Sequence, residues 1–240
     1  MKFFRTAEGR ERHRDRLRHR SARPIDGLPR RLAAWWHLYV TDVGLARLFY
    51  RNRHQVDARL WRSSQPSPAD IAWAARQGIR TVVWLRGDRE LGGFALEREA
   101  CERHGLTLVT LPLWSRSPPT AEMVRAAARL FETIEYPALV HCKSGSDRAG
   151  LASALYLILA AGRPVEEALG QLSLRYGHVP SSKTGVLDAF LEAYRDDGAA
   201  KGQSLIEWVE GGGYDPAALK GSYRSTLWSD LLVDRILRRE

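Results

Sequence analysis

The stretch that decides the fold is PALVHCKSGSDRAG, residues 137–150. Its first four residues predict a short buried strand, and the chain from Gly150 onward continues as an apolar helix. Between them lie Cys142 and five small or polar residues, which turn back toward a helix that begins near Arg148. Successive backbone N–H groups and the positive end of that helix then converge on one point, where a dianion such as phosphate is stabilised.

The side chains of this segment predict a nucleophile inside an anion site. The N–H groups, the helix end and Arg148 stabilise negative charge on sulfur, so Cys142 is expected as a thiolate. Gly145 allows the backbone torsions that a closed loop needs. Arg148 offers a planar fork to two phosphoryl oxygens, and these contacts can tighten in the transition state.

The rest of the chain alternates strand-like and helix-like segments. Strands are expected at residues 60–62, 79–85, 106–113 and 137–140. Helices are expected at residues 68–77, 95–104, 121–135, 150–161, 165–176, 184–197 and 227–238. This alternation predicts an α/β fold, a three-layer domain with a short central sheet flanked by helices and with amphipathic helices near both ends of the chain.

Composition excludes several classes of protein. The 240 residues are 44% hydrophobic, which is too apolar for a disordered chain, and the two cysteines are too few for a disulfide framework or a Cys-rich zinc site. No run of about 20 apolar residues predicts a membrane span, and no secretory signal follows the first charges. A cytoplasmic location is therefore expected, with peripheral attachment to the inner face of the membrane as the alternative.

The excess positive charge is confined to the N-terminal end. Residues 1–31 carry eleven Lys/Arg and four Asp/Glu, or +7 of the net charge of +9. They predict a basic, disordered arm, followed by an amphipathic helix at 32–53, the α/β domain at 54–198 and a C-terminal helical extension at 199–240. The helix at 32–53 either packs on the core or, with the arm, binds an anionic membrane surface. Nucleic acid is an unfavoured partner, because the charge lies in an arm and not on a folded face.

The segment 141–148 resembles the Cys-x5-Arg signature of the protein tyrosine phosphatase superfamily, in particular the compact dual-specificity type. The Arg-Ser-x-Gln-Pro turn at 62–66 and the strand at 78–83 resemble atypical bacterial and fungal members, and the resemblance extends over residues 56–194. It implies that Cys142 forms a thiophosphate intermediate, that Arg148 binds the transferring phosphoryl group and that His141 orients the cysteine. It implies neither a cofactor nor a metal. The phosphate-binding loop would comprise His141, Lys143, Ser144, Gly145, Ser146 and Ala149.

Two departures from the family pattern concern the chemistry. Most members have Ser or Thr after the arginine, where the hydroxyl assists the leaving thiolate, so Ala149 predicts slower breakdown of the intermediate. The family's general acid is usually an Asp about 30 residues before the cysteine, and residues 111–120 contain no carboxylate. Asp147 is the first candidate for the acid, and Asp88 is the second. A structural role for Asp147, as a helix cap or a partner of Arg148, carries equal weight, and a pyrophosphate substrate would need little acid.

Further basic residues are candidates for positive charge around the mouth of the site. They are Lys143, Arg62, Arg86, Arg116 and Lys183. Lys143 is the firmest of these, because a basic residue next to the cysteine resembles phosphatases of inositol phosphates and phosphoinositides. Cys101 is interpreted as an inert, half-buried thiol, and Trp114 lies beside the expected acid loop.

Together these residues predict a cysteine-dependent phosphatase that hydrolyses phosphate monoesters. Its partner is either a phosphorylated protein or a phosphorylated lipid, glycolipid, sugar or inositol phosphate at a membrane surface. The alternative from another class is a catalytically weak phosphate-binding module, with Ala149 and the absent acid as signs of lost activity.

Overall fold

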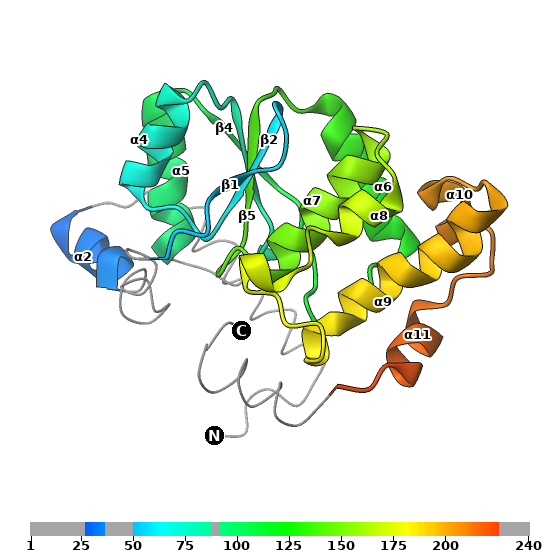
Figure 1. Cartoon of the computed structure of the whole chain (residues 1–240). Helices are drawn as coiled ribbons and strands as arrows, with labels where there is room; N and C mark the ends of the chain where they lie inside the picture. The colour runs from blue at the N-terminus through cyan, green and yellow to red at the C-terminus, as the bar shows by residue number, and fades with distance from the viewer. Residues whose placement is uncertain (1–26, 37–49, 88–91, 226–240) are drawn as a thin grey trace, which may run out of the picture.

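A computed structural model describes residues 27–36, 50–87 and 92–225, which form a sheet covered by helices on both faces (Figure 1). The strands are β1 (His54–Gln55), β2 (Leu60–Ser63), β3 (Thr81–Trp84), β4 (Thr107–Thr110) and β5 (Ala138–His141). Their order in the sheet is β1-β2-β5-β3-β4; β1 is antiparallel to β2, and the other neighbouring pairs are parallel. The predicted three-layer α/β fold is confirmed.

Helices α4 (Pro68–Arg76) and α5 (Gly92–His104) cover one face of the sheet, and α6 (Ala121–Thr133), α7 (Asp147–Leu159) and α8 (Val165–Leu169) cover the other (Figure 1). Successive strand residues alternate between the two layers. Val82 belongs to the same apolar cluster as Ile71 of α4, whereas Val83 belongs to the cluster of Phe131 and Leu151 on the other side.

The central position of β5 places its carboxyl end next to two other strand ends. Its residue His141 is in register with Ser63 of β2 and with Trp84 of β3. Because parallel strands end at the same edge of a sheet, the turn after Ser63 and the segment after Trp84 both meet the segment that begins at Cys142. Ligands of open α/β sheets bind at this edge.

The part of the chain after α7 is divided into shorter helical segments than the sequence predicts. The expected helix at 165–176 is the short α8 followed by the 3₁₀ turn η3 (Leu174–Tyr176), which Gly177 ends with a φ of 77°. The expected helix at 184–197 comprises η4 (Lys183–Gly185), α9 (Val186–Ala193) and the π turn η5 (Tyr194–Gly198). Gly177 supplies the left-handed conformation that ends the first of these helical segments.

The C-terminal segment packs on the same core as the α/β domain. It comprises η6 (Ala199–Lys201), α10 (Leu205–Glu210) and α11 (Pro216–Ser222). Leu205, Trp208 and Val209 are buried in the main apolar cluster, and Trp208 packs so closely on Gly198 that a Cβ there would lie 2.6 Å from the indole. The helix expected at 227–238 lies outside the described residues.

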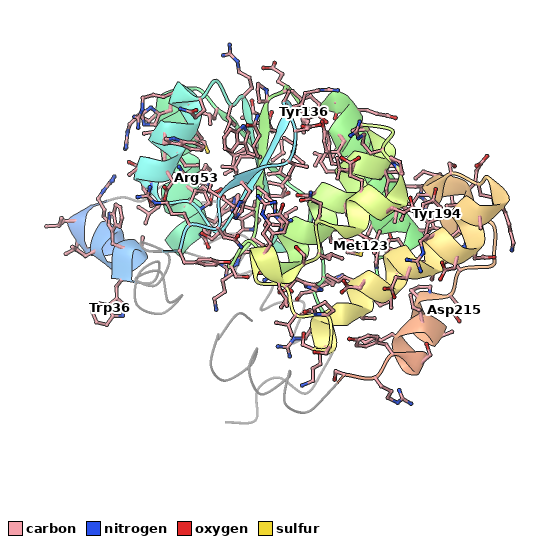
Figure 2. All side chains as sticks on the ribbon, in the orientation of Figure 1. Trp36, Arg53, Met123, Tyr136, Tyr194 and Asp215 are labelled. Atoms are coloured by element: carbon pink, nitrogen blue, oxygen red, sulfur yellow. The ribbon has the colours of Figure 1, made fainter. Side chains whose placement is uncertain are left out.

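Near the N-terminal end, α2 (Leu28–Trp36) begins four residues before the expected start at Leu32. Ala34 packs against Leu96 of α5, and Arg31 lies 3.1 Å from Glu99. The opposite side of the helix exposes Leu28, Leu32 and Trp36 at 69%, 60% and 66%, and Figure 2 shows Trp36 pointing away from the protein body. Residues 37–49, most of the expected helix, and residues 1–26 of the arm lie outside the described part. Among the described helices, none is both long enough and apolar enough to cross a bilayer.

Candidate active site

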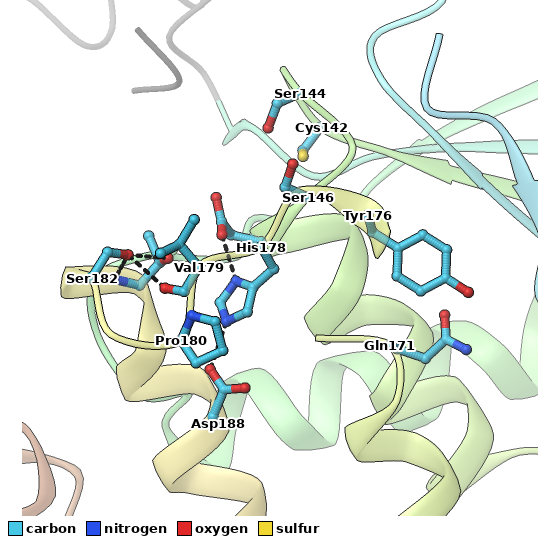
Figure 3. A network of polar contacts seen from close by, with 12 residues as sticks. Cys142, Ser144, Ser146, Gln171, Tyr176, His178, Val179, Pro180, Ser182 and Asp188 are labelled. Carbon is cyan, nitrogen blue, oxygen red and sulfur yellow. Dashed lines mark hydrogen bonds and ion pairs between the residues drawn. The ribbon is translucent and has the colours of Figure 1, made fainter. Parts of the chain in front are cut away.

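The segment 142–146 connects the end of β5 to the start of α7, at the edge where the strands end. Cys142 is buried, and Ser144 and Ser146 lie beside it (Figure 3). The N–H of Gly145 donates to Cys142 Sγ over 3.2 Å. Helix α7 begins at Asp147, one residue before its expected start, so its positive end faces the loop. The predicted strand, loop and helix around Cys142 are thus present.

The loop's carbonyl groups are held by donors from outside the loop. The carbonyl of Lys143 accepts from the N–H of Gln65, and that of Ser144 accepts from Asn52 Nδ2. Those of Gly145 and Ser146 accept from one side chain, Arg62 Nη2, at 2.8 and 3.0 Å. In a trans peptide the N–H points opposite to the carbonyl, so the N–H groups of residues 144–147 face the inside of the loop. Inward N–H groups form an anion site.

Arg62 supports this loop from beneath and adds no charge at its mouth, which corrects the expectation from sequence. Its side chain is fully buried, stacks 3.9 Å over the ring of Tyr176 and also donates to the carbonyl of Gln171 at 2.7 Å. Burial lowers the pKa of Arg62 to about 10. It is therefore charged at neutral pH and acts as a structural cation.

Gly145 is required by its backbone conformation and by its neighbours. Its φ is +76°, and a Cβ at this position would lie 2.6 Å from the backbone nitrogen of Ser64. A side chain there would push the loop away from the end of β2.

On the strand side of the cysteine, His141 forms a buried pair with Glu97 of α5. Nε2 of His141 lies 2.6 Å from Oε1 of Glu97, and both side chains have no exposed surface. The ring packs edge-on to Trp84, with 5.5 Å between centroids. Because Glu97 fixes the ring of the residue before Cys142, it is a site residue that sequence reasoning missed. The available signal was its place in α5, three residues before the buried Ala100 and four before Cys101.

On the helix side, Asp147 is joined to His178, another residue that sequence reasoning missed. Nδ1 of His178 lies 2.6 Å from Asp147 Oδ1, and its Nε2 lies 2.6 Å from Asp188 Oδ2 of α9 (Figure 3). Burial alone would lower the pKa of His178, but its hydrogen bonds with Asp147 and Asp188 outweigh burial and raise that pKa to about 9. His178 is therefore an imidazolium at neutral pH and donates to both carboxylates.

The loop at 111–120, where the family pattern places an acid, is tied to the C-terminal segment. The carbonyl of Pro119 accepts from Tyr214 Oη at 2.7 Å, and Ser117 Oγ accepts from Lys220 Nζ at 2.7 Å. Trp114 is 52% exposed. The loop is thus held at two points by residues that follow α9.

The remaining candidates lie at different places. Arg86 is nearly buried and donates to Gln65 Oε1, so it braces the turn after β2. Lys143 and Arg148 are half-buried, Lys183 is exposed, and Arg116 is half-buried in the loop at 111–120. Ala149 is buried in α7. Asp88 lies outside the described residues.

Cys101 is completely buried, and not half-buried as expected. It belongs to the apolar cluster of α4 and α5, and burial raises the pKa of its thiol strongly. Such a thiol is inert. Within the described ranges, no group of three or more His, Cys, Asp or Glu side chains is placed to hold a metal ion.

Three comparisons with known proteins show what this chain is similar to. A family model described as "DSP-PTPase phosphatase fused to NAD+ Kinase" matches residues 43–185. The dual specificity protein phosphatase TpbA of Pseudomonas aeruginosa is 28% identical over 123 residues, which are 50% of this chain and 53% of TpbA. A beta-lactamase hydrolase-like protein of Xylella fastidiosa is 35% identical over 94 residues, 38% of this chain and 22% of that protein. The chain thus spans about half the length of TpbA.

Two crystal structures of P. aeruginosa TpbA also superpose on the chain at 22% identity. One covers 72% of this chain and 90% of the crystallised chain, with a TM-score of 0.47. The other, a Cys-to-Ser variant in complex with phosphotyrosine, covers 71% and 89%, with a TM-score of 0.45.

Proposed function

This chain belongs to the dual-specificity (DSP-PTPase) family of cysteine phosphatases, and from that premise we propose that it hydrolyses phosphate monoesters through a thiophosphate intermediate on Cys142. The observation that carries the proposal is the orientation of the loop. Its carbonyls are bound from outside by Gln65, Asn52 and Arg62, which supports an inward set of N–H groups for a phosphoryl group beside Cys142.

The proposed reaction has two steps. In the first, Cys142 Sγ attacks phosphorus in line with the leaving oxygen, while the loop N–H groups and Arg148 bind the equatorial oxygens. In the second, water attacks the thiophosphate, and the sulfur leaves as a thiolate that the loop N–H groups and the start of α7 stabilise.

Asp147 is the proposed general acid. Residues 111–120 contain no carboxylate, whereas Asp147 lies between the loop and Arg148, at the first position of α7. In the proposed reaction, a carboxyl group next to Arg148 in the chain protonates the oxygen that leaves. Its contact with His178 adds a third partner to the two structural roles considered from sequence, a helix cap and a partner of Arg148.

Hydrolysis of 4-nitrophenyl phosphate in the presence of a metal chelator tests the proposed activity. Turnover is expected for the natural chain and should be lost in Cys142→Ser, while Cys101→Ser, the matched change at the second cysteine, should keep it. No turnover at any pH between 5 and 9 would support the alternative of a phosphate-binding module. Asp147→Asn should lose far more rate with phenyl phosphate, a poor leaving group, than with 4-nitrophenyl phosphate.

For the substrate, we propose a phosphorylated protein first, since the relative TpbA is named a dual specificity protein phosphatase. A phosphorylated lipid, glycolipid or inositol phosphate is the second candidate. Lys143 favours it, as does the exposed apolar side of α2 formed by Leu28, Leu32 and Trp36, which follows the basic arm in the sequence. Turnover of phosphotyrosine peptides, phosphoinositides and sugar phosphates, compared at equal concentration, distinguishes these classes.

Co-sedimentation with phosphatidylserine vesicles tests the membrane surface that the second candidate needs. A triple change of Leu28, Leu32 and Trp36 to Ser should reduce binding at least about tenfold, because about 0.8 kcal/mol is lost for each apolar CH₂ that leaves the membrane. Leu174→Ser removes another exposed leucine, outside α2, and should leave binding unchanged. Equal binding by all three proteins would contradict the membrane proposal.

A further inference from the structure

We propose that His178 is the proton reservoir of the reaction, acting through Asp147 and held in one tautomer by Asp188. This inference rests on the proposed function and names the source of the proton that the leaving oxygen takes. His178 does not touch the phosphoryl group, so it is a positioning residue that works on the acid.

The three side chains form a line from the loop into the protein. Asp147 is at the start of α7, His178 follows η3, and Asp188 is in the first turn of α9. Both bonds to the ring measure 2.6 Å, and the His178 ring is completely buried. Short bonds between buried charged groups are strong, because no water competes for the donors.

Charge explains why this imidazole keeps its proton inside the fold. The carboxylates of Asp147 and Asp188 are the charged groups that act on the ring, one from α7 and one from α9. Arg62 of β2 interacts electrostatically with Asp147 and Cys142. Ser182 and Thr184 follow His178 in the chain and are uncharged. Their hydroxyl groups are hydrogen-bonded to each other at 2.9 Å.

Asp188 determines which nitrogen can release a proton. The Nε2–H remains donated to Asp188 in both states, so the neutral ring carries its proton on Nε2. Nδ1 is then the site that gives and takes a proton, and it faces Asp147. The same logic applies wherever a buried carboxylate fixes a histidine tautomer.

The proton balance follows from these contacts. In the first step the S–P bond forms and the P–O bond breaks, and the electron pair of that bond goes to the leaving oxygen. The Asp147 carboxylate takes a proton from Nδ1 of His178, and the carboxyl group so formed gives its proton to that oxygen. In the second step the attacking water returns a proton to Asp147 and thence to Nδ1, and the S–P electron pair returns to Cys142.

The segment that carries His178 is fixed by the C-terminal part of the chain. Tyr223 Oη is 2.6 Å from the carbonyl of Pro180 and 2.7 Å from that of Ser182. The carbonyl of Pro180 lies 1.6 Å from where a Cβ on Gly185 would stand, so only glycine fits there. A rigid segment of this kind keeps the ring in line with Asp147.

Two variants and two substrates test the proposal. His178→Gln keeps hydrogen-bonding groups but cannot supply a proton, and it should lower kcat/KM for phenyl phosphate by about a hundredfold, the scale of general acid catalysis. Its rate with 4-nitrophenyl phosphate should fall less than about threefold, because that leaving group needs little protonation. The double variant Asp147→Asn with His178→Gln should be no slower than Asp147→Asn, since both residues serve one proton.

Asp188→Asn gives an independent readout through pH. The natural protein should keep its phenyl phosphate activity up to about pH 9, where His178 loses its proton. With a neutral amide in place of Asp188, this alkaline limit should move to lower pH, while the profile for 4-nitrophenyl phosphate is unmoved.

The outcomes separate the two proposals. If neither substrate is turned over by the natural chain, the proposed phosphatase activity fails. If both substrates are turned over but His178→Gln slows them by the same factor, and Asp188→Asn leaves the alkaline limit in place, His178 is structural and the reservoir is refuted. A large loss confined to phenyl phosphate, with the shifted limit, supports it.

Discussion

The two buried histidines on either side of the nucleophile differ in their partners. His141, on the strand side, has one carboxylate partner, and among the described residues neither its Nδ1 nor Oε2 of Glu97 has a hydrogen-bond partner. His178, on the helix side, has a carboxylate on each nitrogen. The first pair balances one imidazole against one carboxylate, whereas the second has two carboxylates for one imidazolium.

From this difference we assign the orientation of Cys142 to the strand side and the supply of the proton to the helix side. The His141–Glu97 pair fixes the strand end at which Cys142 begins, and Trp84 packs against it. The second pair adjoins Arg148 and the phosphoryl site. The loop at 111–120 carries no carboxylate and is tied to Tyr214 and Lys220. Within the described residues we therefore place the proposed acid on the helix side.

Loss of Arg62 should have the largest effect on stability and turnover. Arg62 holds the loop 142–146, which lies between the His141–Glu97 pair and the Asp147–His178 pair. Arg62→Met removes the side-chain donor from the carbonyls of Gly145 and Ser146, although the carbonyl of Ser146 keeps the N–H of Gly150. Removing one partner from a buried charged network costs about 3–5 kcal/mol, and urea unfolding should show a loss of this size together with loss of turnover. Arg59→Met is the matched control, since Arg59 also stacks on a tyrosine ring but is exposed; it should cost less than about 1 kcal/mol. Comparable losses in the two variants would contradict the supporting role of Arg62.

The pH dependence of stability that His178 supplies should be the next largest effect. The pKa of His178 is raised to about 9, so its contribution is complete below about pH 6.5 and is lost as pH rises through 9. A rise of this size corresponds to about 3 kcal/mol of unfolding free energy. Urea unfolding at pH 6 and pH 9.5 should show this decrease for the natural chain and a much smaller one for His178→Gln. If the unfolding free energy changed equally with pH in the two proteins, the charge assigned to His178 would be contradicted.

Glu97→Gln should have a smaller effect, and of a different kind. The amide keeps an acceptor for His141 but loses the charge-assisted bond and buries an NH₂ group, at a cost of about 1–2 kcal/mol in unfolding free energy. Turnover of phenyl phosphate and of 4-nitrophenyl phosphate should fall by the same factor, because orientation of Cys142 serves both substrates. A selective loss with phenyl phosphate would show that the strand side also supplies protons.

Sequence patterns were sufficient for the parts of the site that follow one another in the chain. The apolar run before Cys142, the small residues after it and the helix from Arg148 are local signals, and the layers follow from the alternation of strands and helices. The partners from distant segments carry no such signal. Glu97, His178 and Asp188 are ordinary polar residues in helical or turn segments, and only the fold brings them to the loop. The sequence predicts Arg62 at the rim of the site, whereas the structure buries it over Tyr176. This burial depends on packing between distant segments, which no local pattern shows.

The smallest expected effect concerns the second half of the reaction, at Ala149 on the helix side. A hydroxyl at this position would donate to the sulfur as the thiophosphate breaks, so Ala149→Ser should speed that step by about threefold to tenfold, or about 1 kcal/mol in the barrier. Rapid mixing with 4-nitrophenyl phosphate measures it: a burst of nitrophenol from the natural chain shows that breakdown is slow, and the variant should show a smaller burst and a faster steady rate. Since Ala149 is buried, the unfolding free energy of the variant is the control for packing. An unchanged burst in a stably folded variant would mean that the loop N–H groups and the start of α7 already stabilise the leaving thiolate without a hydroxyl.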